Sequence, residues 1–179
     1  EHRYDHEKEH SVELHAAWLQ HIFGTDDPVP VFAALVHDPT RNNGEPYDGK
    51  GVGLTPFIDA LRQALADVGG TTLIVCSADL SHCGPAFGDQ DALSGEDAEV
   101  RRRRDEIARH DREMLRILEA RKPDDLVSSM AWQQNPTRWC SIGNLVAGMK
   151  TTGPEHVELI NYAASLDQQG YSWVSSAAT

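Results

Sequence analysis

The residues best suited to chemistry in this 179-residue chain are an aspartate and a histidine that follow an apolar run. Asp79 and His82 come directly after residues 72–78, which have the length and composition of a buried strand. In open α/β sheets, ligands bind beyond the carboxyl ends of the strands, where we expect these two side chains. His82 could then take or give a proton near neutral pH, with Asp79 orienting it or holding charge. The alternative is a turn in which Asp79 caps backbone amides and His82 is a surface residue.

A second polar group lies near the start of the chain, at residues 9–15. Glu9 and Glu13 are four residues apart, and His10 and Glu13 are three apart, so a helix would present them on one face. Such a cluster could bind a metal or a polar substrate. The alternative is the solvated start of a helix, where acidic side chains suit the helix dipole.

Cys140 is the third candidate, because it opens a predicted helix that is rich in small residues. A helix N-terminus lowers the pKa of a thiol, and the thiolate is the form that binds metals and acts as a nucleophile. A buried, inert cysteine is the competing interpretation. Asp111, in the middle of another predicted helix, is expected to be no more than an exposed charge.

The elements that must position these residues alternate between helix and strand, which predicts an α/β fold with a central sheet flanked by helices. Thr55 is expected to cap one helix, with Pro56 at its first position. The whole chain is predicted to form a single α/β domain over residues 1–179. The predicted helices cover residues 12–23, 56–68, 96–121, 123–133 and 140–148, and the predicted strands cover residues 29–36, 72–78, 157–163 and 171–175.

Composition excludes several classes of protein. A net charge of −12, from 28 acidic and 16 basic residues, argues against a general nucleic-acid binder, which needs a basic face. The four arginines at 101–104 have acidic neighbours and are interpreted as a solvated helix face. No run approaches the roughly 18 apolar residues of a membrane span. Three cysteines suit reduced thiols in a cytoplasmic protein better than a disulfide scaffold. Common nucleotide, structural-zinc and hydrolase motifs are absent.

Four stretches together resemble the Memo family, including its members called AmmeMemoRadiSam system protein B. They are Glu-His-Ser-Val-Glu at 9–13, Ser-Ala-Asp-Leu-Ser-His-Cys-Gly at 77–84, Cys140 before a small-residue helix, and Asn-Tyr-Ala-Ala-Ser at 161–165. Their order and rough spacing match the family over nearly the whole chain. The combination of the first two motifs is quite specific, whereas either alone would be weak.

The resemblance implies a fold similar to that of class III extradiol dioxygenases, with a mononuclear iron or copper site held by two histidines and a cysteine. Cys140 matches that cysteine, and His82 matches the acid/base histidine of the dioxygenases. Asp79 and His10 match polar residues that line the same cleft, so that His10, with its neighbour Glu9, is expected to bind substrate.

The sequence also departs from the family pattern. The family's N-terminal half, which holds its Pro-His-Ala-Gly and Ser-His motifs, has no counterpart here, so the two histidine ligands would have to come from elsewhere. The chain also opens without a Met, and it is interpreted as the C-terminal portion of a Memo-like domain, completed by a missing segment or by another chain. Ser141 and Asn144 stand where the family usually has Gly and Pro.

Three functions follow as hypotheses. The first is a metal-dependent redox protein, dioxygenase-like, because a thiolate beside imidazoles suits iron or copper. The second is a non-catalytic module that binds a peptide or a small acid in the same cleft. The third is a metal-dependent hydrolase, with a zinc-bound water and His82 or Asp79 as the base. The first requires that Cys140 and His82 face a common pocket.

Overall fold

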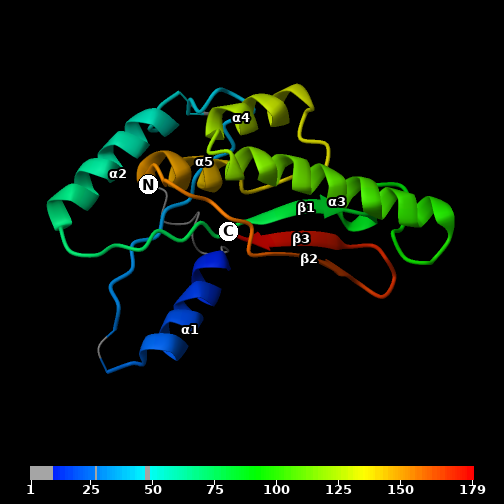
Figure 1. Ribbon diagram of the computed structural model, residues 1–179, viewed down its shortest axis with the longest axis horizontal. Helices are drawn as coiled ribbons and strands as arrows, with labels where there is room; N and C mark the ends of the chain where they lie inside the picture. The colour runs from blue at the N-terminus through cyan, green and yellow to red at the C-terminus, as the bar shows by residue number, and fades with distance from the viewer. Residues whose placement is uncertain (1–9, 27, 47–48) are drawn as a thin grey trace. The chain divides into compact units, whose positions relative to one another are not determined.

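The computed structural model describes residues 10–26, 28–46 and 49–179. Within these residues it contains five α-helices, one short 3-10 helix and a sheet of three strands (Figure 1). The chain divides into two compact units, Glu1–Val36 and His37–Thr179, which are described separately below. The predicted mixture of helices and strands is confirmed, but the sheet is smaller than expected and entirely antiparallel.

The first unit is built around helix α1 (Ser11–Phe23), as predicted. The helix ends at Gly24, whose N–H donates to the carbonyl of Gln20. The strand predicted at residues 29–36 is wrong, because this segment has no strand pairing and the Phe32 side chain is 80% exposed. An apolar composition favours a strand only where a neighbouring strand supplies the hydrogen bonds, and no described strand does so here.

The second unit holds four helices at nearly the predicted positions: α2 (Leu54–Val68), α3 (Ala98–Glu119), α4 (Pro123–Trp132) and α5 (Ile142–Thr152). The predicted cap of α2 is wrong by two residues, because Gly53 is the N-cap and Pro56 lies within the first turn. Proline fits there because the first turn of a helix has no internal partner for its N–H groups. The start of α3 is capped by Asp97, whose side chain accepts a hydrogen bond from the N–H of Val100.

The sheet of the second unit has the order β1-β3-β2 and is formed by β1 (Asp79–Cys83), β2 (Asn161–Leu166) and β3 (Trp173–Ala178). The two closing strands occur close to where they were predicted. The strand predicted at 72–78 is wrong: those residues are unpaired and Leu73 is 77% exposed. Pairing begins instead at Asp79, opposite Ser176 of β3. Asp79 and His82 therefore lie within a strand and not beyond its end.

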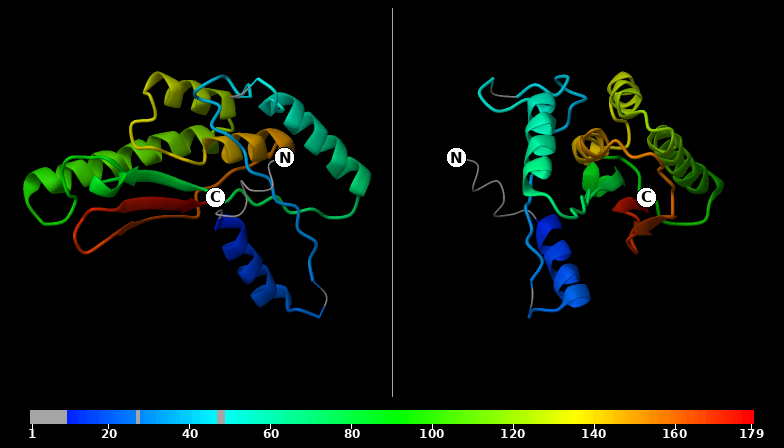
Figure 2. Two further views of the ribbon diagram at one scale, coloured as in Figure 1. Left: turned by 180° about the vertical axis from the view of Figure 1, so that it is seen from behind. Right: turned by 60° about the vertical axis from the view of Figure 1, so that its left-hand side comes forward.

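Helix α3 runs along the sheet, and the views in Figures 1 and 2 agree on this arrangement. It packs against β1 and α4, while α5 packs against α4 and α2. The largest side chains in the core come from the strand, the helices and the loops between them; they are Trp139, Leu80, Leu93, Leu126, Met130, Ile142 and Val146. This core brings β1, α3 and the segment before α5 together, and these are the elements on which the candidate site is built.

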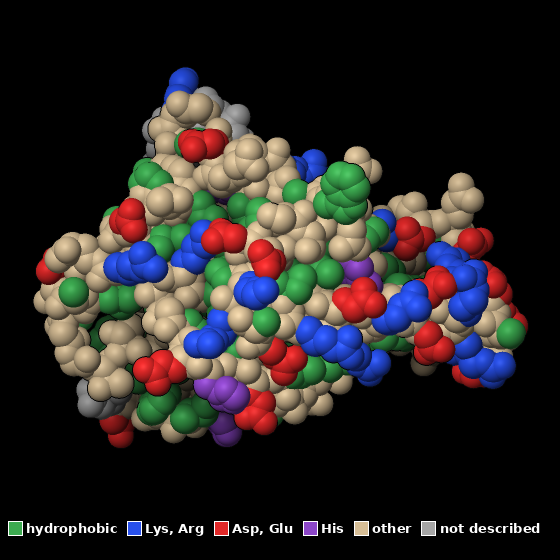
Figure 3. Space-filling view, turned by 45° about the horizontal axis from the view of Figure 1, so that its top comes forward, with side chains coloured by type: hydrophobic (Ala, Val, Ile, Leu, Met, Phe, Trp, Pro, Cys, Tyr) green, Lys and Arg blue, Asp and Glu red, His purple; other side chains and the backbone are tan. Residues whose placement is uncertain are grey.

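The charged side chains of α3 form ion pairs along its exposed side. Arg102 lies 2.6 Å from Glu99 and 2.7 Å from Glu106, and Arg103 lies 3.1 Å from Asp91. Figure 3 shows basic and acidic side chains interspersed on the face in view. In the part of the chain that the structure describes, no helix has the length and apolar character needed to cross a membrane.

Candidate functional site

The backbone of His82 joins β1 to the loop between α4 and α5. Its N–H donates to the carbonyl of Thr137 at 2.8 Å, and its own carbonyl accepts from Nε of Arg138 at 2.8 Å. The pairing of β1 with β3 is irregular between Asp79 and His82, which leaves room for this second set of partners. The strand is thus held on both sides at the position of the histidine.

The ring of His82 is oriented by two carbonyl groups. Nδ1 lies 3.1 Å from the carbonyl oxygen of Leu80 and 3.2 Å from that of Arg138. Because carbonyl oxygens only accept hydrogen bonds, we infer that Nδ1 carries the proton of the neutral ring and that Nε2 has a free lone pair. Nε2 faces Asp79, whose Oδ2 is 3.9 Å away. This separation is too long for a hydrogen bond but short enough for an ion pair when the ring is protonated.

The loop at residues 134–138 has an unusual backbone. Gln134, Asn135 and Arg138 all adopt positive φ angles, of 59°, 46° and 58°. Outside glycine this conformation costs about 1 kcal/mol or more per residue and persists where surrounding contacts enforce it. Part of that enforcement comes from the Asn135 side chain, which donates to the carbonyl of Trp139 and accepts from its N–H, each at 2.8 Å. The loop is therefore a fixed element that ends at Cys140.

Cys140 lies two residues before the first residue of α5, close to the predicted position. Its side chain is exposed, so the interpretation as a buried, inert cysteine is wrong. Sγ lies 3.2 Å from the hydroxyl of Ser141. Beside the thiol is a surface pocket of about 470 Å³, which is lined by Asp38, Arg41, Gln134, Asn135, Pro136, Arg138, Trp139 and Cys140. Mainly polar groups therefore surround the space next to the thiol.

The other two thiols are poorer nucleophiles and ligands. Burial raises the pKa of the Cys83 thiol to about 11, with Asp89 and Asp111 adding to the effect and Arg138 opposing it. Burial also raises the pKa of Cys76. Because a thiol must be reached by its ligand or substrate, Cys140, whose side chain is exposed, is the most accessible of the three.

An ion pair ties the loop to the turn after β1. Arg138 lies 2.7 Å from Oδ2 of Asp89, and the same oxygen accepts the N–H of Gly84 at 2.6 Å. Burial by itself would raise the pKa of Asp89, but the hydrogen bonds from Arg138 and Gly84 and the nearby positive charges outweigh it and hold the pKa below its usual value. Gly84 has a φ of 105°, and a Cβ there would lie 2.5 Å from the carbonyl oxygen of Tyr171. Only glycine fits this turn.

Asp111, which the sequence predicts to be an exposed charge, is fully buried, so that prediction is wrong. Its carboxylate accepts four hydrogen bonds from uncharged donors, and we call this group the Asp111 cluster: Asp111 with Ser81, Trp139, Tyr162 and Ser175. The donors satisfy the carboxylate inside the core, which makes its burial possible. Helical spacing could have revealed it, because residues 107, 111, 114, 115 and 118 form one stripe of α3.

The structure brings some of the predicted site residues together. Asp79 and His82 face each other on β1, and the His82 ring contacts the carbonyl of Arg138, two residues before Cys140. His82 itself is not among the residues that line the pocket beside Cys140. His10 belongs to the first unit, where it is exposed and its side chain makes no cap hydrogen bond at the start of α1. Glu9 lies outside the described residues.

The family resemblance implies iron or copper, and the described residues do not by themselves form such a site. Among residues 10–26, 28–46 and 49–179, no three His, Cys, Asp or Glu side chains are close enough to hold a metal ion. The chemistry of the available donors is suitable, since Cys140 offers a soft sulfur ligand and His82 an imidazole. Their number is too small. The remaining ligands would have to come from outside the described residues.

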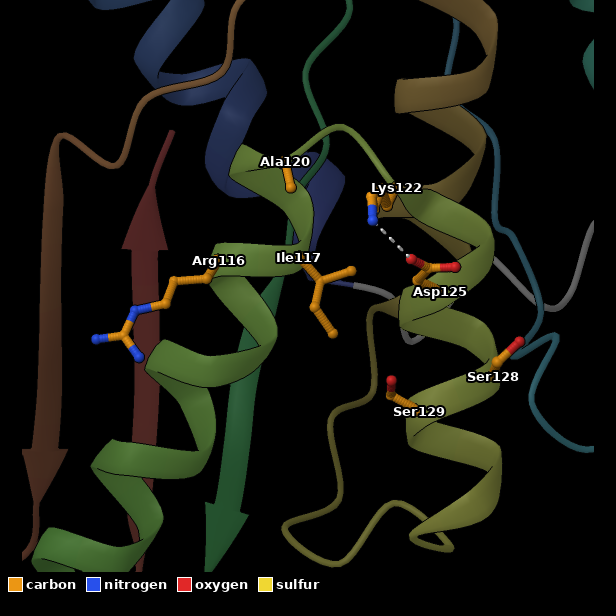
Figure 4. A pocket seen from close by; sticks show the side chains of 7 residues that line it. All are labelled: Arg116, Ile117, Ala120, Lys122, Asp125, Ser128 and Ser129. Atoms are coloured by element: carbon orange, nitrogen blue, oxygen red, sulfur yellow. Dashed lines mark ion pairs between the residues drawn. The ribbon is translucent and has the colours of Figure 1, made fainter.

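A second surface pocket, of about 370 Å³, lies between the end of α3 and α4 (Figure 4). Its lining is shown in Figure 4 and comprises Arg116, Ile117, Ala120, Lys122, Asp125, Ser128 and Ser129. Lys122 pairs there with Asp125 at 3.5 Å, and Arg116 points away from the space. None of the predicted site residues lines this pocket, so it adds nothing to the candidate site.

Comparison with known proteins identifies the family of the chain. No curated protein and no solved structure matches the chain. The family described as Memo-like protein matches residues 1–179, which is the whole sequence. The resemblance found in the four sequence stretches is thereby confirmed, and the chain belongs to the Memo family.

Proposed function

We propose that this Memo-like protein contributes an acid/base histidine, His82, and a metal-binding thiolate, Cys140, to a redox site of the dioxygenase type. The observation that supports this best is the orientation of the His82 ring. Its Nδ1 is engaged by two backbone carbonyls, so Nε2 is the nitrogen that remains for proton transfer. The similarity to the dioxygenase fold, the site residues and a cytoplasmic location are all part of this proposal.

Proton transfer needs only groups that the described residues supply. In its neutral form His82 can accept a proton at Nε2 from a substrate hydroxyl or amine within hydrogen-bond reach. The imidazolium that results keeps its Nδ1–H bonds to the carbonyls of Leu80 and Arg138. It also gains an ion pair with Asp79 at 3.9 Å, which is half exposed and therefore contributes modestly.

Cys140 is the residue that would hold the metal. Its thiol is exposed, stands at the end of a fixed loop and borders a polar pocket. Iron or copper bound there would supply one-electron and dioxygen chemistry. The missing ligands are proposed to come from residues outside those described or from another chain, in agreement with the two histidines that the family resemblance implies.

The metal part of the proposal is tested by metal content. The full-length protein, loaded anaerobically with ferrous iron or cuprous copper and desalted, is compared with its Cys140→Ala variant by elemental analysis. We expect the variant to lose most of the bound metal, and the matched Cys76→Ala control to retain it, because the pKa of Cys76 is raised by burial. Equal metal content in the parent and the Cys140→Ala protein would contradict the proposal.

The acid/base part is tested separately with the loaded protein. Asparagine at position 82 can still donate to the two carbonyls but cannot take a proton. We expect His82→Asn to keep its metal and to slow dioxygen consumption in the presence of ascorbate. A variant that consumes dioxygen at the same rate as the parent would exclude His82 from proton transfer.

Two competing functions have distinct outcomes. The polar pocket beside Cys140 would also suit a non-catalytic module that binds a peptide or a small acid. Such a module would retain partner binding in a His82→Ala, Cys140→Ala double variant. Zinc in the purified protein, in place of iron or copper, would favour a hydrolase with His82 or Asp79 as the base.

A further inference from the structure

Asp111 lies where the elements that hold the two proposed functional residues meet. Its Oδ1 accepts a hydrogen bond from the hydroxyl of Ser81 at 2.5 Å and from Nε1 of Trp139 at 2.7 Å. Ser81 directly precedes His82, and Trp139 directly precedes Cys140. One carboxylate oxygen is thus bonded to the chain neighbour of each functional side chain.

These two bonds connect three separate elements. Asp111 is on α3, Ser81 is on β1, and Trp139 is in the segment before α5. All three side chains are buried, with Trp139 at 1% exposed and the other two at 0%. Water therefore cannot replace either donor, and hydrogen bonds to a charged acceptor are short and directional. This oxygen therefore adds a buried side-chain link between the loop and β1 to the backbone hydrogen bonds that His82 makes with Thr137 and Arg138.

The second oxygen of the carboxylate is occupied as well, which prevents rotation of the group. Oδ2 accepts from the hydroxyl of Tyr162 at 2.7 Å and from that of Ser175 at 2.6 Å. Burial, together with the hydrogen bond to Asp111, raises the pKa of Tyr162, so its hydroxyl remains a donor. Ser175 in turn accepts the N–H of Ser81 at 3.0 Å. Strands β2 and β3 thereby hold the carboxylate in one orientation.

We propose that Asp111 is a positioning residue that fixes His82 and Cys140 relative to each other through Ser81 and Trp139. The inference deepens the proposed function and depends on it for the roles of His82 and Cys140. A positioning role and a purely stabilising role predict different effects when single donors to Asp111 are removed. Loss of a donor to Oδ1 should affect the functional side chain beside it, whereas loss of the Tyr162 hydroxyl, after which Ser175 still holds Oδ2, should affect only stability.

The test uses two readouts on the metal-free, full-length protein. The rate of Cys140 alkylation by iodoacetamide reports the placement of the thiol, and the ¹⁵N shifts of the His82 ring report which nitrogen carries the proton. We expect Trp139→Phe to accelerate alkylation several-fold. Ser81→Ala should mix the two ring tautomers without changing alkylation. Asp111→Asn should produce both effects.

Tyr162→Phe is the matched control, because it removes one donor from Oδ2 and leaves both bonds to Oδ1. It should lower the unfolding temperature and leave both readouts unchanged. If Asp111→Asn does not fold, the single-donor variants at Ser81 and Trp139 decide the question. The proposal would be overturned if Ser81→Ala and Trp139→Phe both fold and both match the parent in alkylation rate and ring ¹⁵N shifts. It would also be overturned if Tyr162→Phe changed these two readouts as much as they do. Neither readout involves metal or turnover, so a failure of the redox proposal is recognised separately.

Discussion

The Asp111 cluster and residues 72–78 both adjoin β1, and they contradict expectation in opposite directions. In the cluster, a charged side chain is 0% exposed, whereas Leu73 in the apolar segment is 77% exposed. Asp111 can be buried because four donors satisfy its carboxylate. Leu73 is exposed because its segment has no strand pairing and lies outside the core that β1 and α3 form. Burial follows from available partners more than from the polarity of a side chain.

Removing the Asp111 carboxylate, which accepts the four hydrogen bonds, should have the largest effect. Asp111→Ala leaves four buried or half-buried donors without their partner and should lower the free energy of unfolding by about 3–5 kcal/mol. Urea unfolding at neutral pH measures the loss. Asp105→Ala is the control, since Asp105 is an exposed acid on the same helix and should change stability by no more than about 0.5 kcal/mol. If Asp111→Ala lowered the free energy of unfolding no more than Asp105→Ala does, the hydrogen bonds of Asp111 would contribute little to stability.

Leucine-to-alanine substitutions in residues 72–78 and in β1 compare the exposed segment directly with the buried strand. Leu80 of β1 is 2% exposed, and Leu80→Ala should lower the free energy of unfolding by about 3 kcal/mol. Leu73→Ala, seven residues earlier, should cost no more than about 0.5 kcal/mol. Both are measured by urea unfolding at a low and at a high protein concentration. Equal costs would show that residues 72–78 are covered in solution, and a dependence on protein concentration would identify a second copy as the cover.

Cys83, at the end of β1, is a buried thiol whose effect on stability can be tested at alkaline pH. Burial is the main cause that raises its pKa from 9.0 to about 11, so the folded state favours the neutral thiol. The resulting stability is fully present below pH 9.0 and is lost as the pH rises through about 11. The loss should reach about 2 kcal/mol. Between pH 8 and 11 the free energy of unfolding should fall less steeply with pH for Cys83→Ala than for the parent; equal slopes would show that the buried thiol does not titrate in this range.

The smallest expected effect concerns the partly exposed ion pair of Arg138 with Asp89. Because the pKa of Asp89 is held below its usual value of 3.8, the pair stabilises the fold above that pH and is lost as the pH falls through the lowered pKa. Asp89→Asn should therefore cost about 1 kcal/mol at pH 6, and the difference from the parent should shrink in stronger acid. Asp105→Asn serves as the control. A difference that is constant with pH would show that the charge is unimportant.

The helices were predictable from the sequence because their signals are local. Apolar spacing and terminal glycines located α1, and the apolar stripe located α3 within two or three residues of its ends. The cap of α2 was misplaced because Thr55 and Pro56 fit the first turn as well as its start. Such errors are small, since a helix satisfies its own backbone.

The strands were less predictable because they depend on partners elsewhere in the chain. Residues 72–78 have strand composition, yet pairing starts at Asp79, where β3 supplies the hydrogen bonds. The candidate site shows the same division. Asp79, His82 and Cys140 were proposed from their types and positions alone, whereas the burial of Asp111 depends on donors 28 to 64 residues away along the chain. No short motif contains such a set.

A glycine in a signature sequence is readily taken as a mark of activity. Gly84 occurs in the conspicuous motif at 77–84, yet its conformation and the carbonyl of Tyr171 already demand the absence of a side chain. A sequence that kept this turn but carried no chemistry would still need the glycine. The presence of Gly84 in the motif therefore reports the path of the backbone after β1 and says nothing about activity.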